Sequence, residues 1–177
     1  MIIRLSSKLA KKIHYSPTQI LPLEGNPYAD WSAHLFTADR TQYILITNTV
    51  SLYSMVLFGK GIINDEQFLD RVVGYMSEFI QDDELVFVYK RLIMPSTGCV
   101  GFSKALNLSV TSCMNDLVLR AKMLFLDREL SPYDVSFHLN RVPRKHLNFS
   151  TPREAFLMLP VGVGDPSQRD DLGESTV

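Results

Sequence analysis

Three side chains of types that carry acid–base or nucleophilic chemistry stand out: His34, Cys113 and Asp116. Cys113 lies near the start of a predicted helix, where the pKa of a thiol is lowered, and a histidine from elsewhere in the chain would then activate it. This pattern is compatible with a hydrolase or transferase of unknown substrate, provided that the three side chains come within hydrogen-bond reach. We favour the alternative that Cys113 is a small buried residue of a core helix.

A second set of polar and aromatic side chains is better suited to binding than to catalysis. Trp31 offers a stacking surface, although a buried tryptophan beside a hydrogen-bonded histidine explains the same residues equally well. Asn115 and Asp116 are predicted at a helix start, where such residues often act as caps. The candidate binding patch comprises Trp31, His34, Arg40, Asn48, Asn115 and Asp116. It supports our leading hypothesis, a non-enzymatic interaction or regulatory module with an unknown protein partner.

Motifs for cofactors and metals are missing from the sequence. It contains no GxGxxG, GxxxxGK[ST] or HExxH, so the common nucleotide cradles and one common zinc motif are absent. The two cysteines, Cys99 and Cys113, have no CxxC spacing, and the four histidines lack regular ligand spacing. We therefore predict no metal and no cofactor, and reduced thiols in the cytoplasm.

Charge is nearly balanced overall but unevenly distributed. The formal net charge of −1 argues against a general binder of polyanions. A basic segment nevertheless lies near the end of the chain, at Arg141, Arg144, Lys145 and Arg153, and the first residues are basic as well. Solvated helical faces explain most charge patterns of this kind. The alternative is a nucleic-acid-associated role through the 141–153 segment.

Residues 31–58 contain the strongest architectural signal. Three runs rich in aromatic and branched residues, 31–37, 42–47 and 52–58, are separated by short polar intervals, which predicts an antiparallel meander. Asp39 and Asn48 favour the intervening turns. Both faces of the second and third runs are largely apolar, so helices must cover the sheet on more than one side.

Helical periodicity supplies the covering elements. A helix at about 65–80 has an Asn64 cap and a clear apolar stripe, and a second helix is predicted at about 111–127. A short strand is predicted at 2–5, and further helices begin after Ser6, Ser131 and Thr151. Residues 81–104 have mixed strand and helix signals, and their structure stays open.

Length and composition indicate one domain. The chain has 177 residues and is 46% hydrophobic, enough for a substantial core. We predict a single α+β domain over residues 1–160, an antiparallel sheet packed against several helices, and a disordered tail over 161–177. No apolar run has the length of a signal sequence or a membrane span, which again favours the cytoplasm.

One segment resembles part of an enzyme. Residues 139–156, LNRVPRKHLNFSTPREAF, are similar to the closing stretch of the integrase-type catalytic domain of insertion-sequence transposases. Such enzymes need three carboxylates around two metal ions. The helix upstream has no glutamate at the expected place, and Asp39, Asp82 and Asp83 are in no matching strand context. We therefore do not predict transposase activity.

A longer resemblance covers about residues 1–158. The opening MIIRLSSKLAKKI, the W-x-A-x-LF that begins at Trp31, the ILITN at 44–48, the SCMNDL at 112–117 and the LN-x-x-P at 139–143 resemble a bacterial family known only as a domain of unknown function. The resemblance implies a small cytoplasmic α+β protein with no assigned reaction or cofactor. It transfers no catalytic residue to this chain.

Overall fold

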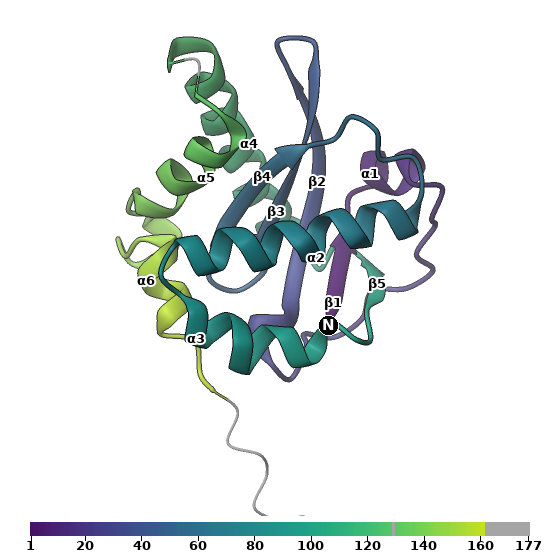
Figure 1. Cartoon of the computed structure of the whole chain (residues 1–177), viewed down its shortest axis with the longest axis horizontal. Helices are drawn as coiled ribbons and strands as arrows, with labels where there is room; N and C mark the ends of the chain where they lie inside the picture. The colour runs from purple at the N-terminus through teal and green to yellow at the C-terminus, as the bar shows by residue number, and fades with distance from the viewer. Residues whose placement is uncertain (129, 162–177) are drawn as a thin grey trace, which may run out of the picture.

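A five-stranded mixed sheet with the strand order β4-β3-β2-β1-β5 organises the chain (Figure 1). The computed structural model describes residues 1–128 and 130–161, so all of the predicted tail except Val161 lies outside the described residues. The strands are β1 (Ile2–Leu5), β2 (Asp30–Ala38), β3 (Thr41–Asn48), β4 (Ser54–Phe58) and β5 (Gly101–Lys104). Helices cover both faces of this sheet, which confirms the predicted α+β class.

The predicted meander forms strands β2, β3 and β4. β2 and β3 pair in antiparallel fashion from Trp31↔Asn48 to Ala38↔Thr41, and β3 pairs with β4 in the same sense. Asp39 and Arg40 both have positive φ, 41° and 59°, as a tight two-residue hairpin turn requires. The strand runs and turn residues were therefore sufficient to predict this half of the sheet.

The other half of the sheet differs from the prediction of an antiparallel sheet. β1 lies between β2 and β5 and runs parallel to both, so that Ile3 is level with Trp31 and Phe102. Parallel neighbours need long connections, and the pairing cannot be read from local turn signals. β5 comes from the 81–104 region whose structure stayed open. Residues 86–96 of that region are helical: α3 (Val86–Val88), a π-helical turn (Tyr89–Ile93) and a 3₁₀ turn (Met94–Ser96).

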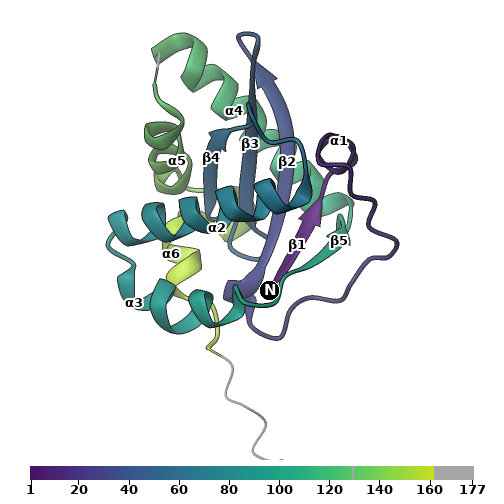
Figure 2. The same cartoon turned by 45° about the vertical axis from the view of Figure 1, so that its right-hand side comes forward.

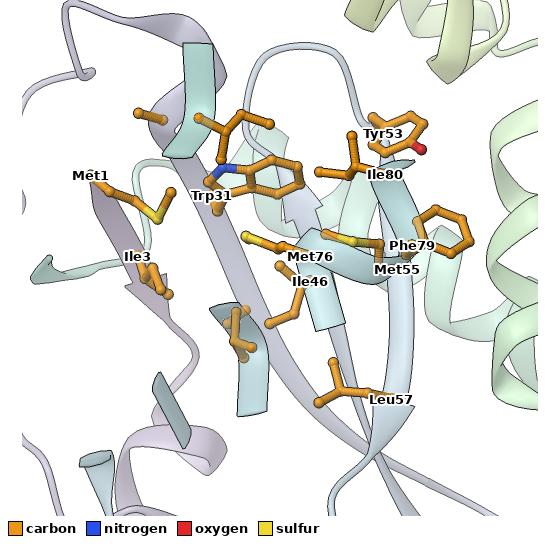
Figure 3. Close-up of a cluster of buried hydrophobic side chains, with 14 of the residues drawn as sticks. Met1, Ile3, Trp31, Ile46, Tyr53, Met55, Leu57, Met76, Phe79 and Ile80 are labelled. Atoms are coloured by element: carbon orange, nitrogen blue, oxygen red, sulfur yellow. The ribbon is translucent and has the colours of Figure 1, made fainter. Parts of the chain in front are cut away.

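The first face of the sheet packs mainly against α2 (Asp65–Asp82), which crosses the strands in Figures 1 and 2. Figure 3 shows Met76 and Ile80 of α2 beside Trp31 and Ile46 of the sheet, all within one buried apolar cluster. The 3₁₀ turn η1 (Pro27–Ala29) leads into β2, and two short helices, α1 (Ser7–Lys12) and α6 (Pro152–Leu157), contribute to the same cluster. Phe156 of α6 stacks on Tyr53 at 4.5 Å between ring centroids.

The second face packs against α4 (Leu108–Arg128) and α5 (Pro132–Arg141) in a separate apolar cluster. α5 also covers the edge strand β4. Asn140 accepts the Ser54 N–H at 2.7 Å and donates to the Ser54 carbonyl at 2.8 Å, and Ser136 accepts the Val56 N–H at 2.8 Å. These bonds occupy backbone groups that an open sheet edge would present to another chain.

Helix starts agree with the prediction in four cases and differ in one. Ser6, Asn64, Ser131 and Thr151 cap α1, α2, α5 and α6, and Thr151 forms a capping box with Glu154. α4 begins at Leu108 rather than near 111, because Asn107 caps it by accepting the Val110 N–H at 2.9 Å. Asn115 and Asp116 therefore lie inside α4 and do not cap it. In the described residues, no helix has both the length and the apolar character needed to cross a membrane.

Candidate functional site

The neighbouring residues Asn115 and Asp116 line two different cavities, because successive side chains of a helix point about 100° apart. Asn115 and His34 line a cavity of about 770 Å³ between α1, the end of β5 and the start of α4. We call it the His34 cavity. Asp116 lines a cavity of about 550 Å³ between α4 and Arg144. The predicted patch is thus divided between two places.

The His34 cavity is basic. Its charged lining residues are Lys8, Lys11 and Lys104, and no carboxylate of the described residues lines its wall. Leu5, Ile20 and Met114 contribute apolar surface beside hydroxyl and amide groups of Ser6, Thr111 and Asn115. Such a mixture of apolar wall and a few convergent polar groups is typical of small-molecule sites.

His34 is half-buried in this wall. Burial lowers the pKa of its imidazole below the ordinary 6.5, and the positive charges of Lys8 and Lys122 lower it further. The neutral ring is therefore favoured at pH 7, and it has one donor and one acceptor nitrogen. Lys8 belongs to α1 and Lys122 to α4, so charged residues of both helices act on the ring in addition to burial.

A buried ion pair holds the loop that closes the His34 cavity. Arg4 and Asp30 are both fully buried in the sheet, and Arg4 also donates to the carbonyls of Leu21 and Pro22 at 2.8 Å each. Ser103 accepts the Leu21 N–H at 2.9 Å. In the sequence, Arg4 is one of several basic residues near the start of the chain and Asp30 has no distinguishing feature, because pairing across neighbouring strands has no local signal.

The second cavity is bordered by Arg144, which is half-buried. Its Nε and Nη2 atoms are buried and have no hydrogen-bond partner among the described residues. Burial and the nearby charge of Arg120 lower the pKa of the guanidinium, while Asp116 and Cys113 raise it. A buried donor without an acceptor is rare in native proteins, and each instance needs an explanation.

An apolar stripe runs along α4 beside Arg144. Leu119, Met123 and Leu126 are 61%, 56% and 62% exposed, at the i, i+4 and i+7 spacing of one helical face. Arg120 and Asp127 flank them in the cavity wall. We call the surface formed by Leu119, Arg120, Met123, Leu126 and Arg144 the α4 face. Sequence analysis did not single out the apolar stripe, because helical periodicity alone does not show which of two apolar faces is covered.

Two residues of the predicted patch are fully buried. The Trp31 ring donates its N–H to the Tyr28 carbonyl at 2.9 Å. Asn48 donates to the Pro27 carbonyl at 2.8 Å and accepts the Ser51 N–H at 2.9 Å, which fixes the turn before β4. Both side chains are thus occupied by structural contacts and expose no surface to a partner.

Arg40 lies at the opposite end of the same strands, in the exposed β2–β3 turn. Seven residues of strand separate the Trp31 and Ala38 levels, about 23 Å at roughly 3.3 Å per residue. Burial of two members and this separation mean that the six residues do not form a single patch. Only His34 and Asn115 share a cavity.

The predicted basic segment is divided as well. Arg153 bonds to the Asp83 carboxylate at 3.0 Å and to the Asp83 carbonyl at 2.8 Å. Arg141 lies over the Phe137 ring at 5.3 Å and borders an acidic cavity with Asp82, Asp83 and Glu84. Arg144 faces α4, and Lys145 is exposed. The four cations do not face one common surface.

The residues considered for catalysis are separated too. His34 and Asp116 line different cavities, and Cys113 is buried. Burial and Asp116 raise the pKa of the Cys113 thiol, which is opposite to the shift that activates a nucleophile. In the described ranges, no group of three or more histidine, cysteine or acidic side chains is placed to hold a metal ion.

These features define a small α+β protein with a mixed five-stranded sheet and two candidate binding surfaces on either side of α4. The chain belongs to the family described as Domain of unknown function (DUF6933), whose model matches residues 2–155. This match confirms the resemblance to a family known only as a domain of unknown function. No curated protein matches the chain.

Proposed function

We propose that the protein is a non-enzymatic interaction module of the bacterial cytoplasm and that the α4 face is its partner-binding surface. The observation that carries this proposal is Arg144, whose buried Nε and Nη2 donors have no acceptor in the described part of the chain. Both cysteines are free thiols, in keeping with a reducing compartment.

An acceptor from a partner would explain the state of Arg144. Leaving a buried donor unmatched costs about 1–3 kcal/mol, and more when the donor is charged. A carboxylate that accepts two parallel N–H bonds from a guanidinium forms one of the stronger polar contacts in proteins. Because Nε and Nη2 are buried in the free chain, the Arg144 side chain would rearrange to present both donors to such a group in the adjoining cavity.

The apolar stripe indicates which kind of side chain surrounds the partner carboxylate that would bind Arg144. Leu119, Met123 and Leu126 present a row of apolar side chains, the pattern by which a helix face binds a partner segment with apolar anchors. Arg120, Arg128 and Arg144 line the cavity together with Asp116 and Asp127, so its charge is nearly balanced and suits a single carboxylate better than a dense polyanion. The partner that fits is therefore a protein segment with one acidic side chain among apolar ones.

Site-specific photocrosslinking in the native host tests this proposal. A benzoylphenylalanine in place of Met123 should form an adduct with one partner protein, and the same probe in place of Phe87, a 70% exposed residue of α3, should not. The purified partner should bind the wild-type chain and lose affinity for Arg144→Gln, with Arg144→Lys only partly active because lysine lacks the bidentate fork. An adduct that survives Arg144→Gln, or a second copy of this chain as the only adduct, would overturn the proposal.

A nucleic-acid-associated role through Arg141, Arg144, Lys145 and Arg153 is the weaker alternative. Its support is the clustering of these cations in the sequence, and it is weakened by the Asp83 contacts of Arg153 and the acidic neighbours of Arg141. Salt-dependent retention of DNA or RNA, lost in Arg144→Gln/Lys145→Gln, would favour it. No retention at low salt would exclude it.

A further inference from the structure

The His34 cavity has the shape and charge of a ligand site that is separate from the α4 face. Its volume of about 770 Å³ is within the range of small-molecule pockets, roughly 300–1,000 Å³. It lies at the carboxyl ends of the parallel strands β1 and β5, since Leu5 and Lys104 are the paired last residues of those strands. This is the edge of a parallel arrangement at which ligands of open α/β sheets commonly bind.

The charges of the cavity wall favour an anionic ligand. Lys8 and Lys11 come from α1 and Lys104 from β5, and no carboxylate is among the wall residues. Because all three lysines line one hollow, an anion bound there would have three positive charges near it. Burial is the main reason why the pKa of His34 is lowered, and the charges of Lys8 and of Lys122 of α4 lower it further.

The rest of the cavity wall favours a ligand that also has an apolar group. Leu5, Ile20 and Met114 line the cavity, and Ile20 is 57% exposed on its rim. Burying such surface against an apolar ligand is favourable, whereas a bare inorganic ion would leave it in water. The neutral imidazole of His34 in β2 and the amide of Asn115 in α4 add directional hydrogen-bonding groups.

The wall is also held in place before any ligand arrives. The loop that carries Ile20 is fixed on one side by the Lys104 N–H, which donates to the Gln19 carbonyl at 3.0 Å. Next to it, the Leu21 carbonyl accepts from the buried Arg4 guanidinium at 2.8 Å. A preformed cavity of this kind binds without the cost of ordering a loop.

We propose that the His34 cavity binds a small organic anion, in which a phosphate or carboxylate group lies among Lys8, Lys11 and Lys104 and an apolar body packs against Leu5, Ile20 and Met114. The site is independent of the α4 face, so a failure of one proposal leaves the other intact.

Titration of ¹⁵N-labelled protein with four probes tests this inference: phenyl phosphate, benzoate, inorganic phosphate and the neutral benzyl alcohol. Phenyl phosphate, benzoate or both should shift the amide signals of His34, Thr111 and Asn115, and the stronger of the two identifies the preferred anionic group. Inorganic phosphate should bind more weakly than phenyl phosphate, and benzyl alcohol more weakly than either aromatic anion. Dissociation constants above about 10 mM for both aromatic anions would overturn the proposal. So would equal shifts with benzyl alcohol.

Matched variants test whether the probes bind in the His34 cavity. Lys8→Gln/Lys104→Gln should weaken binding of the better probe by about tenfold, because two of the three wall cations are lost. Lys60→Gln/Lys90→Gln removes two exposed lysines outside the cavity and should change affinity by much less. Equal weakening in both variants would mean only a general charge effect and would overturn the site. If the Lys8→Gln/Lys104→Gln variant does not fold, two measurements on the wild-type protein test the same point. They are the amide shifts caused by the probe and the salt dependence of its affinity.

Discussion

Arg4 and Asp30 form a fully buried bidentate ion pair across strands β1 and β2. The Arg4 Nε–H donates to Oδ1 at 2.8 Å and its Nη2 donates to Oδ2 at 2.7 Å. The remaining donors of the guanidinium reach the Leu21 and Pro22 carbonyls and the Ser103 hydroxyl, and Asp30 also accepts the Glu24 N–H. Every charge in this group is matched, so the pair fixes the loop over the sheet and, with it, one wall of the His34 cavity.

Removing one partner of this pair should be strongly destabilising. Arg4→Met leaves the Asp30 carboxylate buried without its cation, and we expect the free energy of unfolding, measured by urea denaturation, to fall by about 3–5 kcal/mol. Arg4→Met/Asp30→Leu removes both charges and should recover much of that loss. A loss of similar size in Arg71→Met, at an exposed position of α2, would contradict the role assigned to the pair.

Asn140 should protect the edge of the sheet. Asn140→Ala leaves the N–H and carbonyl of Ser54 without their side-chain partner, and we expect a loss of about 1–3 kcal/mol in urea denaturation. Because β4 is an edge strand, light scattering should also rise faster on warming than in the wild type. His138→Ala, an exposed change in the same helix, is the control and should leave both measurements nearly unchanged.

The ionisation of His34 should make stability depend on pH. Its pKa is lowered in the folded protein, so the unfolded chain binds more protons between that pKa and about 6.5, and the free energy of unfolding falls as pH decreases through this window. NMR titration of the imidazole should show the lowered pKa. Lys8→Gln should raise this pKa, because it removes one of the two lysine charges, Lys8 and Lys122, that lower it, whereas Lys60→Gln should not. An unchanged pKa in Lys8→Gln would refute the electrostatic account.

The buried donors of Arg144 should reduce the free energy of unfolding of the protein when no partner is bound. Arg144→Met keeps most of the aliphatic contacts and removes the unmatched buried donors, so we expect the free energy of unfolding to rise by about 1 kcal/mol or more. Lys145→Met, at an exposed neighbour, is the control. A destabilised Arg144→Met would show that the guanidinium already has a favourable partner in the free chain, and the α4 face would lose its main support.

Local patterns predicted much of the fold. The meander at 31–58, the helix that begins after Asn64 and the caps at Ser6, Ser131 and Thr151 follow from residue types within a few positions of one another. The 85–94 segment was undecided because LVFVYKRLIM suits a buried helix and a buried strand equally. The site was predicted less well: His34 and Asn115 share a cavity, but Trp31 and Asn48 are buried and Arg40 is at the distant turn.

By itself, the sequence determined most of the elements, four of the helix caps and the family, because these depend on short-range chemistry and ordered motifs. The tertiary structure alone decided the parallel placement of β1 and β5, the pairing of Arg153 with Asp83 across 70 positions and the division of Asn115 and Asp116 between two cavities. These outcomes depend on which distant segments meet and which faces they cover. Whether a charge is matched, as at Arg4, or left unmatched, as at Arg144, is likewise set by neighbours that no local pattern specifies.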